Sequence, residues 1–297
     1  MNTCRKKMPR CGSEIKAFLC YALFTAFFPL FAFDWPRPAE NVGLFFAQKQ
    51  ADVFNRGLIF TNPSEVTTAD SGRILITIQN DFENTALFPS TLGTALIVEH
   101  KNRIFTVYGG LEKITAAQAF SGAGAVTSRE SIGVSGSSGW KKENQSLEFQ
   151  VIDTHIKAAI NPLILMENPV KVKRFLIRNV TAVSKTGSRI PLSGGIGLGA
   201  GTYVLYTEII SGTMPYTTEV SVNGTLTEKT DYNALKTHKE KIRIQGSAEY
   251  DFNSIYAEKN MLRLAEVALS KGKNTIDIKI TDIGGQESLS HIPLSVF

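Results

Sequence analysis

Hydrophobic and polar residues alternate along much of the chain with a period of two, which is typical of β-strands. Ile74, Ile76 and Ile78 are therefore expected to share one face of a strand. A hairpin is expected at 96–107, because two apolar stretches there flank a short polar turn that contains Asn102. Since short turns join these strands and no long helical period intervenes, the pattern predicts an antiparallel sheet folded on itself.

A further alternating stretch lies downstream of the hairpin. Leu147, Phe149 and Val151 predict a strand with an apolar face. Glu148 and Gln150 are then expected to share the opposite face, because successive side chains of a strand point to opposite sides.

The second half of the chain has the same alternating character. Asn161-Pro162-Leu163 closes the first part, and a second all-β module is predicted to begin after Pro169. Asn223-Gly224 is a dipeptide typical of tight hairpin turns. The stretch 256–268 fits either a helix or a pair of strands, because its apolar residues suit both periods. The strands expected in this module are Arg174–Ile177, Thr202–Tyr206, Glu219–Val222 and Thr275–Ile280.

The amino terminus differs from the rest of the chain in charge and hydropathy. Five Lys and Arg residues at positions 5–16 precede the apolar run 17–32, which Pro29 interrupts near its end. A basic region followed by an apolar run is typical of an export signal, here cleaved near Ala32. The run is also close to the length of a membrane-spanning helix, so an uncleaved inner-membrane anchor is the alternative. Either interpretation predicts a protein exported to the periplasm or cell envelope of a bacterium.

Composition excludes several other classes of protein. The 297 residues, 43% of them hydrophobic, are enough for about two domains. All three cysteines (Cys4, Cys11 and Cys20) lie within the export segment, so the rest of the chain needs neither disulfides nor a thiol nucleophile. With five cations and one Glu, residues 1–32 account for +4 of the formal net charge of +5. The remainder is almost neutral, which argues against nucleic-acid binding.

The stretch 96–111 resembles the strand, turn and strand of the M23 (LytM-like) peptidoglycan endopeptidases. It ends in Tyr108-Gly109-Gly110-Leu111, where that family normally has Tyr-x-His-Leu. The resemblance therefore places Gly110 at the position of a functional histidine. His100 matches a position that is not a ligand in the family, and it is expected at the surface.

The stretch 54–59 resembles the first metal-binding motif of the same family. The family reads Phe-His-x-Gly-x-Asp, whereas this chain reads Phe-Asn-Arg-Gly-Leu-Ile. Asn55 thus stands for the histidine and Ile59 for the aspartate. Ile59 offers no donor atom to a metal, and Asn55 offers only a weak, neutral one.

A third stretch lies where the family has its His-x-His-Phe-Glu strand. This chain has Ser146-Leu147-Glu148-Phe149-Gln150 at that place, so Ser146 and Glu148 replace the two histidines. The preceding segment 132–139 resembles the glycine- and serine-rich turn of the family. Trp140 follows it beside the expected groove, where an indole can stack on a sugar or a peptide.

These replacements remove the chemistry that the family uses. A hydrolytic zinc site takes three protein ligands and leaves one position open for a water, whose pKa the metal lowers to about 7. Only Glu148 still offers a charged donor, so we predict no catalytic residue, no metal ligand and no cofactor, although zinc is the cofactor of the family. A rearranged site from Glu148, Asp153 and His155 is an alternative, but an odd spacing puts Glu148 and Asp153 on opposite faces of a regular strand.

The resemblance, which covers about residues 54–166, implies an all-β chain in three parts. They are a signal peptide or anchor at 1–33, a degenerate M23/LytM-like antiparallel domain at 34–168, and a β-sandwich at 169–297 that resembles Ig-like domains. The groove residues expected in the second part are Asn55, Ile59, Gly110, Trp140, Ser146 and Glu148.

The function that the resemblance implies is binding without cleavage. Degenerate LytM domains activate cell-wall amidases, so the expected partner is peptidoglycan or a cell-wall hydrolase. The membrane is expected to be a partner only through an uncleaved amino-terminal segment. Two alternatives remain open: a zinc endopeptidase that cuts peptidoglycan cross-links through atypical ligands, and a structural scaffold of the envelope.

Overall fold

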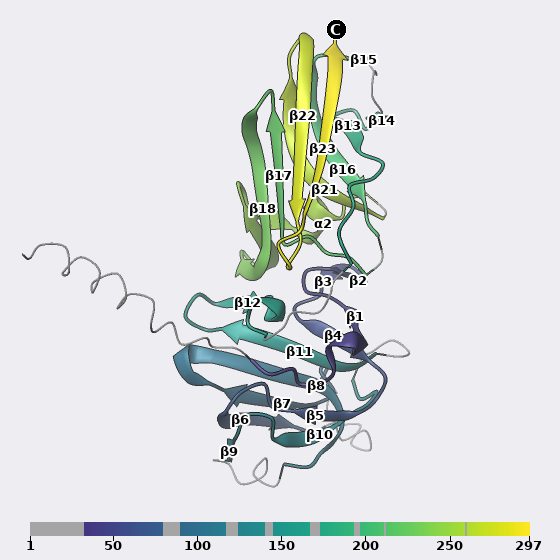
Figure 1. Cartoon of the computed structure of the whole chain (residues 1–297). Helices are drawn as coiled ribbons and strands as arrows, with labels where there is room; N and C mark the ends of the chain where they lie inside the picture. Colours follow the sequence, from purple (N-terminus) through teal and green to yellow (C-terminus); the bar gives the residue numbers. More distant parts are fainter. Residues whose placement is uncertain are drawn as a thin grey trace, which may run out of the picture. The chain divides into compact units, whose positions relative to one another are not determined.

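Strands make up most of the part of the chain that the computed structural model describes, which is residues 33–79, 90–116, 124–139, 145–166, 173–192, 197–210, 212–258 and 260–297. The sheets are mostly antiparallel (Figure 1), which confirms the predicted all-β class. Phe33–Phe297 forms one compact unit. The apolar run 17–32 lies outside the described residues, and within them no helix is long and apolar enough to cross a membrane.

The first part of the chain builds an antiparallel sheet and a separate two-stranded hairpin. Its strands are β1 (Val42–Leu44), β2 (Lys49–Gln50), β3 (Val53–Phe54), β4 (Leu58–Thr61), β5 (Glu65–Thr67), β6 (Gly72–Ile78), β7 (Thr94–Glu99), β8 (Ile104–Ile114), β9 (Ala125–Val126), β10 (Ser131–Ser135), β11 (Gln145–Asp153) and β12 (Ala158–Ile160). Short 3₁₀ helices lie at Ala39–Asn41, Lys101–Arg103 and Pro162–Ile164. β4, β11, β8, β7 and β6 pair in that order, while β10 joins β5 to β8. β2 and β3 form the hairpin.

The alternation in β11 has the predicted effect on burial. Leu147, Phe149 and Val151 are fully buried in the core of this part, and Glu148 and Gln150 lie on the other face. The hairpin of β7 and β8 also forms as predicted. Asn102 in its turn has a φ of 60°, a left-handed conformation that asparagine tolerates better than most residues.

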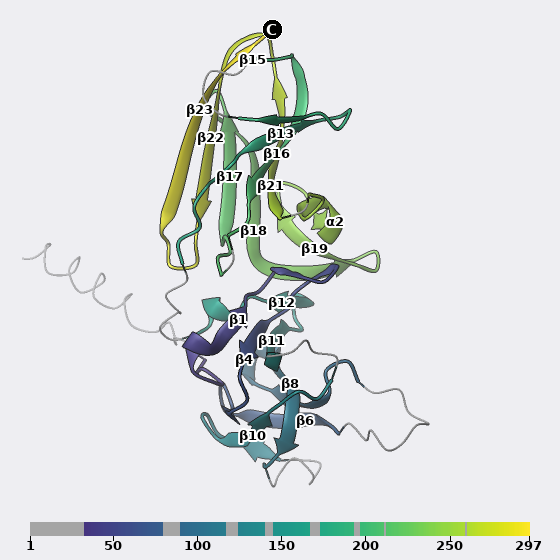
Figure 2. The same cartoon turned by 90° about the vertical axis from the view of Figure 1, so that its right-hand side faces the viewer.

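The second part of the chain consists of two packed layers of strands (Figure 2). Its elements are β13 (Thr181–Ser184), β14 (Arg189–Pro191), β15 (Gly197–Leu198), β16 (Gly201–Glu208), β17 (Thr217–Val222), β18 (Thr225–His238), β19 (Lys241–Gly246), β20 (Tyr250–Asp251), α2 (Phe252–Ile255), β21 (Met261–Leu269), β22 (Gly272–Thr281) and β23 (Glu287–Val296). One layer pairs β19, β18, β17, β22 and β23 in order, and the other pairs β14, β13, β16 and β21. Apolar side chains of both layers form a common core.

Backbone pairing also links the two parts of the chain. β12 pairs with β11 on one side and with β18 on the other, where Ala159 lies opposite Leu235. Phe46 and Phe54, from the first part, pack in the core cluster of the second. The division at residue 168 therefore remains a prediction from the sequence.

Three expectations about the strands need correction. β6 contains a bulge. Ile74 pairs with Val98 and Ile76 pairs with Ile97, so a step of two residues along β6 matches a step of one residue along β7. The extra residue, Leu75, turns Ile76 away from the face of Ile74, and Ile76 is 46% exposed while Ile74 is 7% exposed.

The second correction concerns Arg174–Ile177, which forms no strand. This segment contacts β23 through side chains instead of a backbone ladder, since Arg174 donates to the Glu287 carbonyl and the Ser288 hydroxyl donates to the Phe175 carbonyl.

The structure also decides between the helix and the strands that the sequence allowed at 256–268. Strand β21 covers most of it, and helix α2 ends before it at Ile255.

The third correction concerns His100, which is buried rather than at the surface. Its imidazole lies 2.9 Å from the Ser71 carbonyl through Nδ1 and 2.7 Å from the Thr106 hydroxyl through Nε2. Its ring also packs 5.3 Å from that of Phe33. Burial lowers the pKa of His100, with opposing effects from the Ser71 carbonyl and from Asp70.

Candidate functional site

Asn55 occupies the first metal position of the M23-like pattern, and the fold uses its amide as a structural clamp. The side chain is fully buried, and Nδ2 donates to the carbonyls of Phe45 and Gly57, each at 2.8 Å. The backbone of Asn55 also closes the hairpin of β2 and β3 through Gln48 and Ala47. The amide nitrogen therefore holds backbone carbonyl oxygens in place, while Oδ1, the atom through which an amide would bind a metal, is buried without a hydrogen-bond partner among the described residues.

Ile59 and Glu148 lie directly opposite each other in the neighbouring strands β4 and β11. On its other side Glu148 pairs with Gly109 of β8, so its carboxylate has an alkyl neighbour and a glycine beside it. Ile59 is 1% exposed and belongs to the core. Glu148 accepts a hydrogen bond of 2.5 Å from Gln150 Nε2. The Glu148 carboxylate is thus held by the side-chain amide of Gln150, two residues further along the same strand.

Gly110 is the extra residue of a bulge between β7 and β8, with a φ of +77°. Its N–H donates to the Leu92 carbonyl at 2.7 Å, and its carbonyl accepts from Gly136 at 2.8 Å. Leu92 lies over this strand, because a Cβ on Gly109 would stand 3.3 Å from Leu92 Cδ2. The space next to the expected histidine position therefore holds a side chain of the protein itself.

Ser146 belongs to a buried cluster of hydroxyl groups around Arg37. Arg37 Nη1 donates to Ser146 Oγ at 2.7 Å and to Ser135 Oγ at 3.2 Å. Ser146 Oγ lies 3.0 Å from the Asn62 carbonyl, and Ser135 Oγ donates to the Ser64 carbonyl at 3.0 Å. No histidine contacts either hydroxyl in the described part of the chain, so a general base for a serine nucleophile is absent there.

The guanidinium of Arg37 is an unusual group to find at this place. It is 3% exposed, its Cζ lies 5.7 Å from the centroid of the Phe60 ring, and burial lowers its pKa. No carboxylate among the described residues pairs with it, and its Nε has no hydrogen-bond partner. Sequence reasoning missed Arg37, because its main partner is 109 positions away and nothing in the Pro-Arg-Pro segment points to Ser146.

The groove prediction also included Trp140, which lies outside the described residues. The remaining predicted positions do not form a single group. Glu148 and Ile59 are neighbours in paired strands, whereas Ser146 belongs to the Arg37 cluster.

Zinc does not fit the side chains at these positions. An amide that donates to carbonyls, an alkyl group, a glycine and a serine bound to a guanidinium leave one carboxylate, whereas a hydrolytic zinc needs three ligands. Within the described ranges no group of three or more His, Cys, Asp or Glu side chains is placed to hold a metal ion. The alternative site is dispersed as well, because Asp153 Oδ1 accepts from the backbone N–H groups of His155 and Ile156.

Comparison with known proteins gives one relationship at the level of a family. A protein-family model matches residues 174–297. The chain is 32% identical over 123 residues to an uncharacterized protein of Treponema pallidum (strain Nichols), covering 39% of this chain and 83% of that protein. The chain belongs to the same family as the Treponema protein.

Solved structures with partial similarity include a chain of the SpoIIQ–SpoIIIAH pore forming complex, with a TM-score of 0.36 and 19% identity over 47% of this chain and 93% of that chain. A zinc containing peptidase from Vibrio cholerae has a TM-score of 0.33 and 21% identity, over 40% of this chain and 36% of the peptidase. The chain thus spans about a third of the length of that peptidase. LytU has a TM-score of 0.34 and 19% identity, over 43% of this chain and 84% of LytU.

Proposed function

We propose that the chain is a catalytically inactive, M23/LytM-like protein of the bacterial cell envelope that works by binding a partner. The observation that carries this proposal is the use of the former site for structure. Asn55 clamps backbone carbonyls, and Ser146 solvates a buried guanidinium. An amide oxygen, a hydroxyl bonded to a guanidinium and a single carboxylate are a poor donor set for a hydrolytic zinc, which takes three ligands from His, Cys, Asp or Glu.

The proposed partner is a cell-wall hydrolase that the chain regulates, or peptidoglycan itself. Leu92 lies over Gly109, and the Leu92 carbonyl is bonded to Gly110, so the centre of the family's substrate groove carries a protein side chain. This favours contact with a protein surface over insertion of a stem peptide between the strands. Export to the envelope is proposed from the basic and apolar order of residues 1–32.

Elemental analysis of purified residues 34–297 after zinc loading and dialysis tests the inactive state. We expect far less than one zinc per chain and no release of muropeptides from purified sacculi. Near-stoichiometric zinc, with cleavage that a chelator abolishes, would overturn the proposal in favour of a peptidase with atypical ligands.

Two binding assays then separate the partners. Co-sedimentation with purified sacculi measures affinity for peptidoglycan, and the rate of dye release from labelled sacculi by an added amidase measures regulation of a hydrolase. Replacement of Trp140 by Ala is expected to weaken sacculus binding if the expected groove is used. Absence of both effects would leave the scaffold interpretation and contradict the proposed function.

A further inference from the structure

Strand β23 is a long edge strand that the chain covers only at its two ends. β22 pairs with all of β23, whereas on the other side β15 pairs only with Ser295 and Val296. At the opposite end, Arg174 donates to the Glu287 carbonyl and to the Ser288 hydroxyl. Within the described part of the chain, residues 289–294 pair with β22, and none of them is among the residues paired with β15. Exposed edges of this kind are templates for an added strand.

The phase of the β22–β23 ladder identifies the backbone groups that face outward. Asp282 N–H donates to the Gln286 carbonyl at 3.0 Å, which marks this pair as a hydrogen-bonded one. Hydrogen-bonded and non-hydrogen-bonded pairs alternate along an antiparallel ladder. Leu289 and His291 are therefore at non-hydrogen-bonded positions opposite β22, and their N–H and C=O groups point to the open edge.

Two independent contacts agree with this phase. Pro293, which has no N–H, occupies a non-hydrogen-bonded position opposite Thr275, where the ladder loses nothing. The Glu287 carbonyl, also predicted to point outward, accepts from Arg174. The edge thus offers two complete donor and acceptor sets, at Leu289 and His291.

A cleft of about 570 Å³ lies along this edge, between the two layers of the second part. Residues 290–293 of β23 form one wall, and residues 177–181 with 191–192 form the other. Its apolar lining consists of Ile177, Val180, Pro191, Leu192, Ile292 and Pro293. The cleft is therefore shaped for one extended segment that pairs with β23 and turns an apolar side chain inward.

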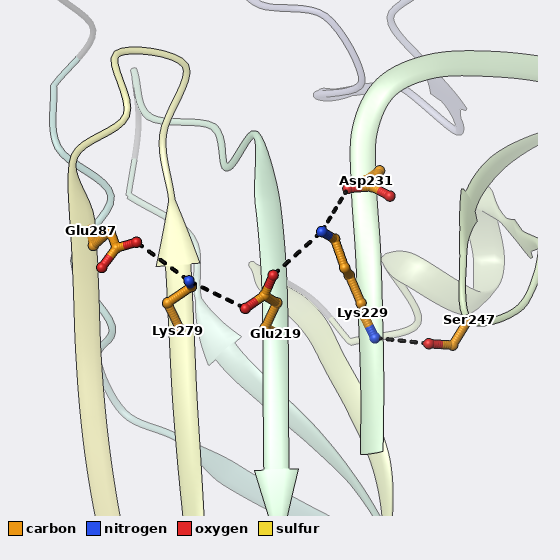
Figure 3. A network of polar contacts seen from close by, with 6 residues as sticks. All are labelled: Glu219, Lys229, Asp231, Ser247, Lys279 and Glu287. Atoms are coloured by element: carbon orange, nitrogen blue, oxygen red, sulfur yellow. Dashed lines mark hydrogen bonds and ion pairs between the residues drawn. The ribbon is translucent and has the colours of Figure 1, made fainter. Parts of the chain in front are cut away.

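The charged side chains around the cleft differ from those on the outer face of the same sheet in whether they are paired. On that face an alternating network joins Glu287, Lys279, Glu219, Lys229 and Asp231 across four strands (Figure 3), so each of its charges has a partner of opposite sign.

At the cleft the guanidinium groups of Arg174 and Arg178 have no carboxylate partner among the described residues. Arg174 contacts only a carbonyl and a hydroxyl, and Arg178 lines the cleft itself. The carboxylates nearby are engaged by other side chains, because Glu208 accepts from Asn179 and Asp277 is bonded to His291. The guanidinium of Arg178, which has no ion pair within the described residues, therefore favours an occupant that carries a carboxylate.

We propose that the cleft is a docking site for an extended, acidic segment of a partner protein, which adds to the edge of β23 as a strand. The partner's backbone bonds to Leu289 and His291, an apolar side chain fills the cleft, and a carboxylate pairs with Arg178. A second copy of this chain fits less well. The inward-facing Ile292 of a second copy already packs in that copy's own core, so it is not available to fill the cleft of the first copy. This site is distant in sequence from the M23-like positions, and its test does not depend on them.

The test uses the full chain and a fluorescein-labelled peptide of sequence Glu-Val-Glu-Val-Glu-Val-Glu, followed by fluorescence anisotropy. We expect saturable binding at peptide concentrations below about 1 mM. The matching peptide with Lys in place of Glu is expected to bind at least about tenfold more weakly. An N-methylated form of the acidic peptide, which lacks outward N–H donors, should lose binding to the unaltered protein.

Variants of β23 and of the rim locate the site. Leu289→Pro removes one outward N–H without breaking a bond to β22, and it should weaken peptide binding about tenfold or more, whereas Leu289→Ala should change it less than about threefold. Arg178→Glu should weaken binding of the acidic peptide and strengthen that of the lysine peptide. Thermal unfolding of each variant identifies any that fails to fold.

Three results would overturn the proposal. They are no binding to the wild-type chain at about 1 mM peptide, equal binding of the N-methylated peptide, or unchanged binding by folded Leu289→Pro and Arg178→Glu variants. Analytical ultracentrifugation tests whether a second copy of this chain, rather than a partner protein, occupies the edge of β23. A dimer of the full chain that Leu289→Pro dissociates would assign the edge to a second copy instead.

Discussion

Arg37 donates a 2.7 Å hydrogen bond to Ser146, the residue that stands where the M23-like pattern has a histidine. A buried cation with no carboxylate partner in the described part of the chain thus lies beside a position where the M23-like pattern has a histidine. Taking a charge out of water costs several kcal/mol, so the hydroxyl groups around this guanidinium are expected to matter for folding.

The first prediction concerns Ser146→Ala. The change removes one acceptor from a buried charged donor, and hydrogen bonds to charged groups contribute roughly 1.5–3 kcal/mol. We expect a loss of that size in the free energy of unfolding, measured by urea denaturation. The matched control is Ser221→Ala, a partly exposed serine in β17 that should change stability by less than about 0.5 kcal/mol.

A double-mutant cycle with Arg37→Met checks the cause of that loss. If Ser146 acts by solvating the guanidinium, Ser146→Ala should cost much less once Arg37 is replaced. An undiminished cost in the Arg37→Met background would show that Ser146 stabilises the fold in another way.

The second prediction concerns Asn55→Asp, a change of nearly the same shape. The side chain then brings a carboxylate toward the carbonyl oxygens of Phe45 and Gly57 in a fully buried place. We expect a loss of about 3 kcal/mol or more at pH 7, because an unpaired charge is buried.

The pH dependence distinguishes this cause from a simple loss of bonds. The carboxyl in the folded variant should have a raised pKa, so the folded state binds the proton more tightly and the deficit should shrink as the pH falls. Asn55→Ala, which loses two hydrogen bonds but introduces no charge, should keep a constant deficit. Equal pH profiles for the two variants would contradict the donor role assigned to Asn55.

The third prediction concerns the buried His100. A neutral imidazole with its proton on Nδ1 can donate to the Ser71 carbonyl and accept from the Thr106 hydroxyl. Burial is the main cause that lowers its pKa in the folded state below the ordinary 6.5, against the smaller effects of Ser71 and Asp70.

The sign of the pH effect follows from this shift. Above about pH 6.5 the imidazole is neutral in both states, and as the pH falls further the unfolded chain takes up the proton first. The free energy of unfolding should therefore decrease from about pH 6.5 downward, more steeply in the wild type than in His100→Gln. Parallel urea midpoints for the two proteins between pH 8 and pH 5 would refute a buried neutral histidine.

Local patterns predicted most of the strands, whereas contacts between distant residues were beyond them. The period of two at Leu147, Phe149 and Val151 is a property of neighbours in sequence, and burial follows it. The same period failed at Ile76, because a bulge depends on the register with the partner strand. It failed again at Arg174–Ile177, which forms no strand and contacts β23 through the Arg174 side chain instead of through backbone pairing.

The candidate site shows the same limit. The motifs assign Asn55, Gly110 and Ser146 to positions where the M23 family has histidines, and this assignment stays a prediction, because it rests on residue types alone. What replaced the donors could not be read in the same way. Arg37 and Leu92 reach the site from segments far away in the chain, and their presence depends on how the strands are assembled.

The last prediction concerns a buried ion pair in the second part. Arg263 on β21 binds Glu228 on β18 through both carboxylate oxygens, with side chains 8% and 6% exposed. Glu228 also accepts from the backbone N–H of Glu266 at 2.9 Å, and the Tyr250 ring lies 4.3 Å from the guanidinium. Burial lowers the pKa of Arg263, but the hydrogen bonds and charge of Glu228 outweigh it, and the net shift is upward.

Arg263→Met leaves the Glu228 carboxylate buried without its counter-ion, and we expect a loss of about 3–5 kcal/mol in the free energy of unfolding. Adding Glu228→Gln should restore much of it, since a neutral amide can still accept from Glu266. The exposed Lys279→Met, which breaks the surface network, is the control and should change stability far less. A double variant no more stable than Arg263→Met would mean that packing on Tyr250, rather than charge pairing, accounts for the loss.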